Sequence, residues 1–387
     1  MSYGFDPRTS QRPSAHFSLL RTVLFACVSH FFVVSALASE PAAGIRVQGP
    51  GVAPRLMFAC CDHGLGEMQS LFADPHVIAN LQDLHAGIAV AILDFSPERA
   101  ELVRRLNQAG VPVIAWLLLS PEQGFYFNVE TAPKAAARFA AFDAWSRDQG
   151  LRWDGVGIDI EPDFAELAAL KGHGRRLYTT LLRRAVDGQH MLRARHAYST
   201  LISTIRSRGY FVQTYQMPFL PAERRAQSSL PDRMLGTVDV RGDQEVLMLY
   251  TSFAHPRGAA IIWTLGPEAQ AIAIGITDGG PSAKPAPLNW SEFSSDLIVA
   301  GHFTRVIGVY NLEGCVRQGF LPRLEAMDWS QSVTIPADAI RSADHLVLVL
   351  VLVLWISSHL LYLVVALVLA IAWIVWRWRT RKMTGGQ

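Results

Sequence analysis

Two carboxylic acids stand two residues apart within an apolar stretch, residues 154–161, whose sequence reads DGVGIDIE. Every second side chain of an extended strand points to the same face, so Asp159 and Glu161 share one face with Gly157. Valine and isoleucine occupy the other face. At about 7 Å apart along the strand, one acid can raise the pKa of the other. A carboxylic acid that stays protonated near neutral pH can donate its proton to a leaving group.

The surroundings of the two acids indicate a functional site. A carboxylate in an apolar interior is destabilising by several kcal/mol unless it is paired, hydrogen-bonded or protonated. Two such acids on one face of a buried strand are therefore more typical of a site than of packing. The alternative is that Asp159 and Glu161 form salt bridges with arginines of the surrounding fold.

Eight short apolar runs between residues 54 and 312 are each followed by a turn and a longer segment with helical spacing. The runs are residues 56–60, 88–93, 111–118, 155–160, 210–215, 246–250, 272–276 and 306–310. Near-continuous apolar strands that alternate with helices favour parallel pairing with helices on the outside. The pattern predicts an α/β fold, a closed (β/α)8 TIM barrel over residues 54–330. An open doubly wound sheet is the alternative.

Helix signals between these runs support that fold. Residues 97–108 follow Ser96, a candidate N-cap, and end before Gly110. Residues 135–149 carry aromatic side chains at helical spacing. Residues 166–208 predict two helices that divide near Asp187. We interpret the arginines of these helices, Arg183 and Arg184 among them, as a solvated face, the alternative being a track for an anionic polymer.

The carboxyl ends of barrel strands are where working residues project, and here those ends are polar and aromatic. Aromatic faces with carboxylates and amides are typical of sugar-binding sites. We predict that substrate is bound by Trp116, Gln213, Tyr215, Met248, Asp278, Tyr310, Asn311 and Glu313. Asp62, His63 and Asp94 also stand at strand ends, although an aspartate there often only caps the following helix.

A resemblance to a known family rests on two of these segments. Residues 154–161 resemble the fourth-strand signature of glycoside hydrolase family 18, the chitinases and endo-β-N-acetylglucosaminidases, which reads Asp-Gly-x-Asp-x-Asp-x-Glu. Residues 248–250, Met-Leu-Tyr, are similar to its Met-x-Tyr segment on the sixth strand. The resemblance implies that Glu161 is the general acid and then base. Asp159 would orient the substrate's own 2-acetamido group, and Tyr250 would hydrogen-bond the acetamido carbonyl.

Substrate-assisted hydrolysis of this kind implies a glycan with N-acetylated sugars as substrate and requires no organic cofactor or metal. Gly157 stands where the family carries its middle aspartate, so Asp159 lacks that partner. One alternative is a non-catalytic glycan-binding barrel. Another is a two-carboxylate retaining glycosidase, with Glu313 or Asp278 as nucleophile about 5 Å from Glu161. Many such barrels have asparagine before the fourth-strand acid, where this chain has Ile160.

The two ends of the chain predict a tethered protein outside the cytoplasm. Residues 1–38 read as a signal peptide cleaved after Ala38, the alternative being an uncleaved anchor. A linker, residues 39–53, leads into the barrel, and a juxtamembrane linker, residues 331–345, leads out of it. The apolar residues 346–376 predict a single membrane-spanning helix, and the basic tail, residues 377–387, should stay cytoplasmic. The barrel would then be periplasmic or at the cell surface.

Charge and cysteine content narrow the remaining options. The formal net charge of +2 does not indicate a nucleic-acid partner. Cys60, Cys61 and Cys315 would lie in an oxidising compartment, where a disulfide that involves Cys315 is one option. Cys60 and Cys61 are adjacent, so on a strand they would point to opposite faces. The residues around them show no metal-ligand spacing, and we predict no metal site there.

Overall fold

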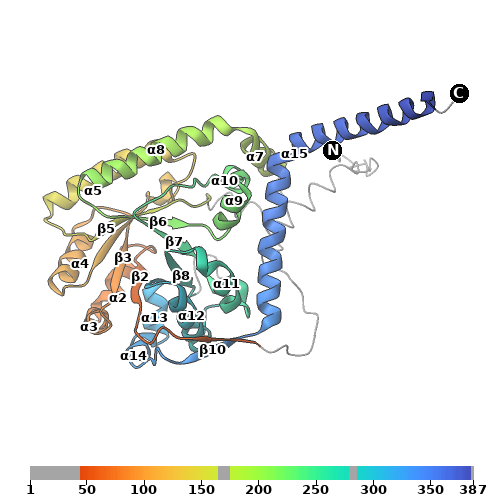
Figure 1. The fold of residues 1–387 in the computed structure, drawn as a ribbon. Coiled ribbons are helices and arrows are strands. Elements are labelled where there is room, and N and C mark those ends of the chain that lie inside the picture. Colours follow the sequence, from red (N-terminus) through yellow and green to blue (C-terminus); the bar gives the residue numbers. More distant parts are fainter. Residues whose placement is uncertain (1–43, 164–174, 279–285, 385–387) are drawn as a thin grey trace, which may run out of the picture. The chain divides into compact units, whose positions relative to one another are not determined.

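The computed structural model describes residues 44–163, 175–278 and 286–384, and Figure 1 shows its ribbon. Eight parallel strands form a closed barrel in which each strand pairs with the next and β9 pairs with β2. The strands are β2 Arg55–Cys60, β3 Gly87–Ile92, β4 Val113–Leu117, β5 Gly155–Asp159, β6 Val212–Gln216, β7 Gln244–Met248, β8 Ala271–Gly275 and β9 Val306–Tyr310. The prediction of a closed barrel is therefore confirmed, and the open sheet is excluded.

Helices follow the strands and cover the outside of the barrel. They are α2 Leu65–Ala73, α3 Pro75–Asp83, α4 Pro97–Gln108, α5 Ala132–Asp148, α7 Arg175–Val186, α8 Gly188–Ser207, α9 Leu220–Ala226, α10 Leu230–Leu235, α11 Gly258–Leu265, α12 Trp290–Phe303, α13 Leu312–Arg317 and α14 Phe320–Glu325. Short 3-10 turns are η1 Pro121–Gln123, η2 Thr251–Ala254 and η3 Gly266–Glu268. Ser96 caps α4 as predicted, accepting from the Arg99 N–H, and α7 and α8 divide at Asp187.

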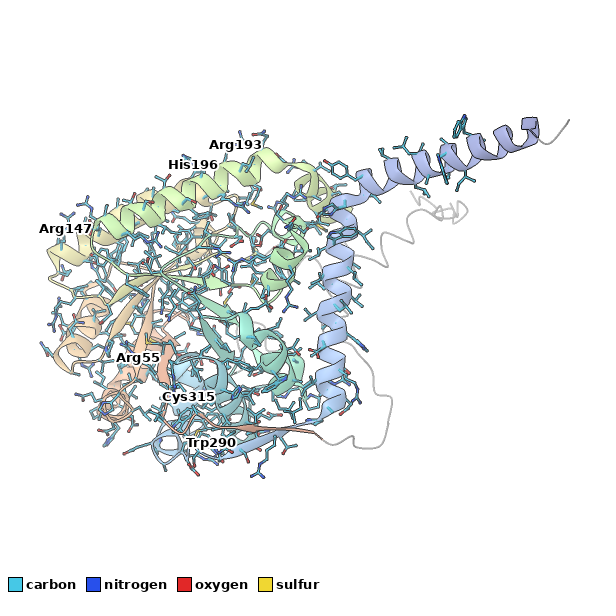
Figure 2. The ribbon with its side chains drawn as sticks, viewed as in Figure 1. Arg55, Arg147, Arg193, His196, Trp290 and Cys315 are labelled. Carbon is cyan, nitrogen blue, oxygen red and sulfur yellow. A yellow bond between two sulfur atoms is a disulfide. The ribbon has the colours of Figure 1, made fainter. Side chains whose placement is uncertain are left out.

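The outer helices carry most of their charge toward solvent. Arg147 on α5 and Arg193 and His196 on α8 point away from the barrel and are exposed (Figure 2). Arg184 departs from the predicted solvated face, because it is buried and donates to Glu130 at 3.1 Å. Part of this basic set therefore stabilises the fold from within.

Strand side chains alternate between two cores, as the strand pattern predicts. Val156, Ile158 and Ile160 are fully or almost fully buried in the layer between strands and helices. A separate cluster fills the barrel interior and includes Ala91 and Trp116. Many interior positions carry alanine or glycine, which leaves room for the large aromatic rings at the carboxyl ends of the strands.

Both segments interpreted as linkers contain regular structure. β1 Ile45–Gln48 pairs antiparallel with β10 Ser332–Ile335 outside the barrel, with Ile45 opposite Ile335. Val47 and Ile335 are buried, so the ribbon is part of the folded unit. It places the start and the end of the barrel side by side.

The chain ends in α15 Ala337–Thr384, which starts inside the predicted juxtamembrane linker and continues through the predicted span. Its first part packs on the barrel, where Leu354 contacts Ala222 and Ala226 of α9. Thr264 donates to Asp344 at 2.8 Å, and Ser358 donates to Ser228 at 2.9 Å. By length and composition, Ala337–Leu360 is long and apolar enough to cross a membrane. The predicted signal peptide lies outside the described residues.

Candidate active site

The two motif acids lie at the carboxyl end of β5, on the side of the barrel interior. Asp159 is 2% exposed, and the indole N–H of Trp116 donates to its Oδ2 at 3.0 Å. Oδ1 of Asp159 has no hydrogen-bond partner among the described residues. Glu161 is half-buried, and its backbone N–H donates to the Phe127 carbonyl at 3.0 Å. The described part of the chain provides neither acid with an arginine or lysine partner, which argues against the salt-bridge alternative.

Burial and like charges shift both acids toward their protonated forms. Burial raises the pKa of Asp159 to about 7, with the nearby Asp62 charge adding to the rise and the Trp116 hydrogen bond opposing it. Burial also raises the pKa of Glu161 well above its ordinary value, and the charges of Asp159 and Asp62 raise it further. A group of acids close enough to repel one another is arranged to hold protons at neutral pH.

Aromatic rings surround the acids. Trp116 lies 6.4 Å from Tyr215 and 6.3 Å from Tyr310 between ring centroids, and Tyr250 lies 5.4 Å from Tyr310. The Tyr250 hydroxyl donates to the sulfur of the buried Met248 at 3.4 Å. Burial and the charges of Glu161 and Asp159 raise the pKa of Tyr250 well above its ordinary value. The structure therefore brings Tyr250, Tyr215, Tyr310 and Trp116 together with the two acids.

The space beside Gly157 is already filled. A Cβ atom at Gly157 would lie 2.8 Å from Cε2 and 3.1 Å from the hydroxyl oxygen of Tyr215. Asp159 and Tyr215 are register partners on β5 and β6. The tyrosine ring thus takes the volume in which the resemblance places a middle aspartate, and Asp159 has the Trp116 N–H as its donor instead.

Asp62 belongs to this cluster more firmly than the sequence indicates. The Tyr310 hydroxyl donates to Asp62 Oδ2 at 2.7 Å, and His63 Nδ1 lies 3.2 Å from Asp62 Oδ1. The hydrogen bond to Asp62 raises the pKa of His63 to about 9, so the imidazole is charged at neutral pH. Asp94 differs, because the fully buried Arg99 holds both of its oxygens, and its role is structural.

The remaining predicted residues are mostly held by the fold. Asn311 is fully buried, donates to Asp278 Oδ2 at 2.7 Å and caps α13 by accepting from the Gly314 N–H. Glu313 is 4% exposed and accepts from the Cys61 N–H at 2.7 Å. Gln213 is buried and donates to Gln244 at 2.8 Å. Burial and these contacts hold Asn311, Glu313 and Gln213 within the fold.

Sequence reasoning missed Tyr126, which is 5% exposed and part of the interior cluster. Burial raises its pKa well above the ordinary value, and the charges of Glu161 and Asp159 add to the rise. Tyr126 stands outside the predicted strands, in the stretch between β4 and α5, so its position offered no strand-end signal. Its aromatic neighbours Phe125 and Phe127 were the available hint.

A cavity of about 30 Å³ lies inside the barrel beneath the aromatic rings, with Tyr215, Tyr250 and Tyr310 in its lining. A volume of this size holds about one or two water molecules. The cavity is therefore far too small for a sugar. A sugar would have to bind above the rings, toward the loops that follow the strands.

The sequence has no significant match among family profiles or among curated proteins. Among solved structures the fold is similar to a GH18 chitinase from Pseudoalteromonas aurantia, at 12% identity and a TM-score of 0.43, over 70% of this chain and 99% of that one. The PgaB (BpsB) glycoside hydrolase domain from Bordetella bronchiseptica is 10% identical, with a TM-score of 0.44, over 71% of this chain and 98% of that one. A mutant tryptophan synthase α-subunit from Pyrococcus furiosus is 13% identical, with a TM-score of 0.37, over 72% of this chain and 97% of that one. All three TM-scores are below 0.5 and the matched barrels differ in activity, so the likeness carries no argument about function.

Proposed function

We propose that this chain is a membrane-anchored glycoside hydrolase that acts, outside the cytoplasm, on a glycan with N-acetylated sugars. The observation that carries the proposal is the state of Asp159 and Glu161. Both stand at the carboxyl end of β5, both have raised pKa values, and both lie among tyrosines rather than arginines. A proton retained by Glu161, the proposed acid, and aromatic surfaces for the sugar rings are what this hydrolysis requires.

Each residue has a distinct part in the proposed reaction. Glu161, whose pKa is raised well above its ordinary value by burial, donates its proton to the departing glycosidic oxygen. The carbonyl oxygen of the substrate's 2-acetamido group attacks the anomeric carbon as that bond breaks. Asp159, held by the Trp116 N–H, orients the acetamido group, and Tyr250 hydrogen-bonds its carbonyl. Glu161, now ionised, takes a proton from the water that completes hydrolysis with retention.

A second candidate, a non-catalytic glycan-binding barrel, is favoured by one observation. Tyr215 fills the space beside Gly157, so Asp159 has no acidic partner on its own strand. A site of this kind could keep its aromatic sugar platform while hydrolysis is slow. The two-carboxylate mechanism gains no such support, because Glu313 is hydrogen-bonded to Cys61 and Asp278 to Asn311.

The tether follows from α15. Leu354 of this helix packs on α9, and Ser358 donates to Ser228 just after α9, so the barrel would lie directly against the first half of the apolar helix. Ala337–Leu360, the part that is long and apolar enough to cross, overlaps these contacts, so within the predicted span, residues 346–376, we propose that the residues after Ser358 lie in the membrane, with the basic tail on the cytoplasmic side. Anchoring of this kind restricts the enzyme to polymers at its own membrane surface.

The direct test uses the purified full chain in detergent, supplied with N-acetylglucosamine oligomers and polymer. Release of reducing ends by the wild type, and its loss in Glu161→Gln, is the expected result. Matched oligomers of glucose, which lack the acetamido group, should not be cleaved. Binding without turnover in both proteins would support the glycan-binding candidate, and cleavage of the glucose oligomers would support a two-carboxylate mechanism.

A further inference from the structure

The adjacent cysteines Cys60 and Cys61 lie on the same side of the backbone, because Cys61 is not part of the strand for which opposite faces were predicted. β2 ends at Cys60, and Cys61 has a φ of 72°, in the left-handed region. This turn of the backbone breaks the alternation of a strand and lets the two sulfur atoms meet. They form a disulfide, so Cys315 is not its partner.

Glu313, distant in sequence, lies next to this pair of cysteines. Its Oε1 accepts from the Cys61 N–H at 2.7 Å, and within the described ranges its Oε2 has no hydrogen-bond partner. A carboxylate oxygen of Glu313 and the two sulfur atoms all lie within 4.8 Å of one another, and all three residues are buried. A buried carboxylate oxygen without a partner is costly, and a bound cation would offset that cost.

We propose that, when the Cys60–Cys61 disulfide is reduced, the two thiolates and the Glu313 carboxylate bind one thiophilic divalent cation such as Zn²⁺ or Cd²⁺. Thiolates are soft ligands that select such ions, and a carboxylate commonly completes the set. With Zn–S bonds of about 2.3 Å in tetrahedral geometry, the sulfur atoms would stand about 3.8 Å apart. The described group of ligand atoms is compact enough to reach that arrangement.

Reduction of the Cys60–Cys61 disulfide requires an external reductant, such as a phosphine. The disulfide takes up two electrons and two protons to give two thiols, while a phosphine is oxidised to its oxide with an oxygen atom from water. Each thiol then releases its proton as the sulfur–metal bond forms. The site would therefore be closed in the oxidised chain and open in the reduced one.

Sequence spacing gives no sign of this site, because Glu313 lies 252 positions from Cys61. The closed barrel brings them together, since β9 pairs with β2 and α13 begins just after β9. Cys315, labelled in Figure 2, stands two positions after Glu313 on α13 and is buried, but it is outside the group of three ligand atoms. It offers a matched control.

The test titrates the reduced full chain with Cd²⁺ alone, after removal of the phosphine, and follows the ultraviolet absorption of cadmium–thiolate bonds. We expect one equivalent of Cd²⁺ per chain in the wild type and in Cys315→Ser, and none in Cys60→Ser or Cys61→Ser. Glu313→Gln should weaken binding by about tenfold or more.

A second measurement needs no substitution and so does not depend on the folding of variants. The oxidised wild type should not bind Cd²⁺ at the site, and reduction of the disulfide should create the binding site.

Three outcomes of the two experiments would each overturn the proposal. They are equal binding by oxidised and reduced chains, binding that survives Cys60→Ser, and an affinity unchanged by Glu313→Gln. The readout is the metal alone, so an absence of glycosidase activity leaves this result intact.

Discussion

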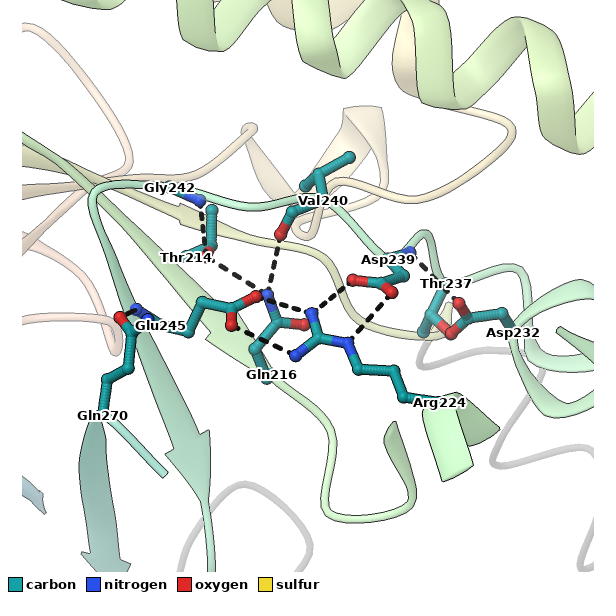
Figure 3. Close-up of polar contacts among 10 residues, drawn as sticks. All are labelled: Thr214, Gln216, Arg224, Asp232, Thr237, Asp239, Val240, Gly242, Glu245 and Gln270. Atoms are coloured by element: carbon teal, nitrogen blue, oxygen red, sulfur yellow. Dashed lines mark hydrogen bonds and ion pairs between the residues drawn. The ribbon is translucent and has the colours of Figure 1, made fainter. Parts of the chain in front are cut away.

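Acidic residues occur in two contrasting regions of the barrel, the β5 mouth and the side near α9. Figure 3 shows the second region, where Arg224 donates to both oxygens of Asp239 and both oxygens of Glu245, at 2.6 to 3.1 Å. At the mouth, Asp159 has one donor, the Trp116 N–H, and its charged neighbour is Asp62. One region matches acid to base, whereas the other places acid beside acid.

The difference indicates which acids serve the fold and which serve chemistry. Carboxylates that share one guanidinium are held by charge-assisted hydrogen bonds, and through Glu245 they tie α9 to β7. Carboxylates that face one another hold protons that a reaction can use. Burial and like charges alone do not separate the two, because Glu223 on α9 is 1% exposed and has a pKa raised to about 9, by burial first and then by the charges of Asp232 and Asp239. Position at a strand's carboxyl end, among tyrosines, is the further requirement.

The largest predicted effect compares one glutamate from each region. Glu161→Gln removes the proposed proton donor and should lower kcat by about 10²- to 10⁴-fold, with little change in stability. Glu245→Gln keeps the shape of its side chain but gives up a charged partner of Arg224, so activity should persist while the unfolding temperature falls. Parallel assays of hydrolysis and thermal unfolding on both variants measure these two effects. Equal losses of activity in the two variants would remove the contrast.

Arg224→Ala tests the structural region directly. The change leaves Asp239 and Glu245 facing each other without a cation, and we expect a loss of about 2–4 kcal/mol in the free energy of unfolding, because the group is less than one-third exposed. Arg224→Lys restores the charge without the paired geometry and should recover part of this loss. Urea unfolding of the full chain measures both. An undiminished stability in Arg224→Ala would show that the network is not what holds α9.

The barrel and the face of β5 were predictable because local patterns and global fold agree there. The eight apolar runs, the Ser96 cap and the alternation around Asp159 each report on residues close in sequence. The rest depends on closure of the sheet. Asp62 gains its partner Tyr310 only because β2 meets β9, a contact between residues 248 positions apart.

Two further differences between prediction and structure, one in the local backbone and one in strand pairing, could not be seen in sequence patterns. On a strand Cys60 and Cys61 would point to opposite faces, but β2 ends at Cys60 and the left-handed Cys61 brings the two sulfur atoms together. Residues 39–53 and 331–345 look like linkers because each strand they contain is short, yet β1 and β10 stabilise each other. Pairing between chain ends is invisible to any single segment.

Gly157→Asp would place an acid back at the mouth and sharpen the contrast between the two regions. Because the new Cβ would lie 2.8 Å from the Tyr215 ring, we expect a loss of about 1–3 kcal/mol in unfolding free energy and no gain in activity. In a Tyr215→Ala background the same change should cost less, since the ring is gone. A double-mutant cycle of unfolding measurements gives the coupling, and additivity of the two changes would contradict the clash.

The smallest predicted effect concerns the single donor that Asp159 has. Its ordinary pKa is 3.8 and its native pKa is about 7, so between these values the unfolded chain releases a proton that the native protein keeps. Stability contributed by this group therefore falls as pH rises through that window, and it is constant below and above it. The Trp116 N–H favours the ionised form, so Trp116→Phe should raise the native pKa further, by about one unit, and extend the loss of stability to higher pH.

The same substitution should move the acidic limb of the activity profile upward, because the proposed mechanism uses ionised Asp159 to orient the acetamido group. Unfolding measured from pH 4 to pH 9, beside the pH profile of kcat, tests both shifts in one protein. Trp145→Phe is the control, since Trp145 packs in the outer core and has no contact with Asp159 among the contacts described. If Trp116→Phe and Trp145→Phe gave the same pH profiles of stability and of kcat, the Trp116 indole would contribute only packing. The raised pKa of Asp159 would then depend on burial and on the charge of Asp62 alone.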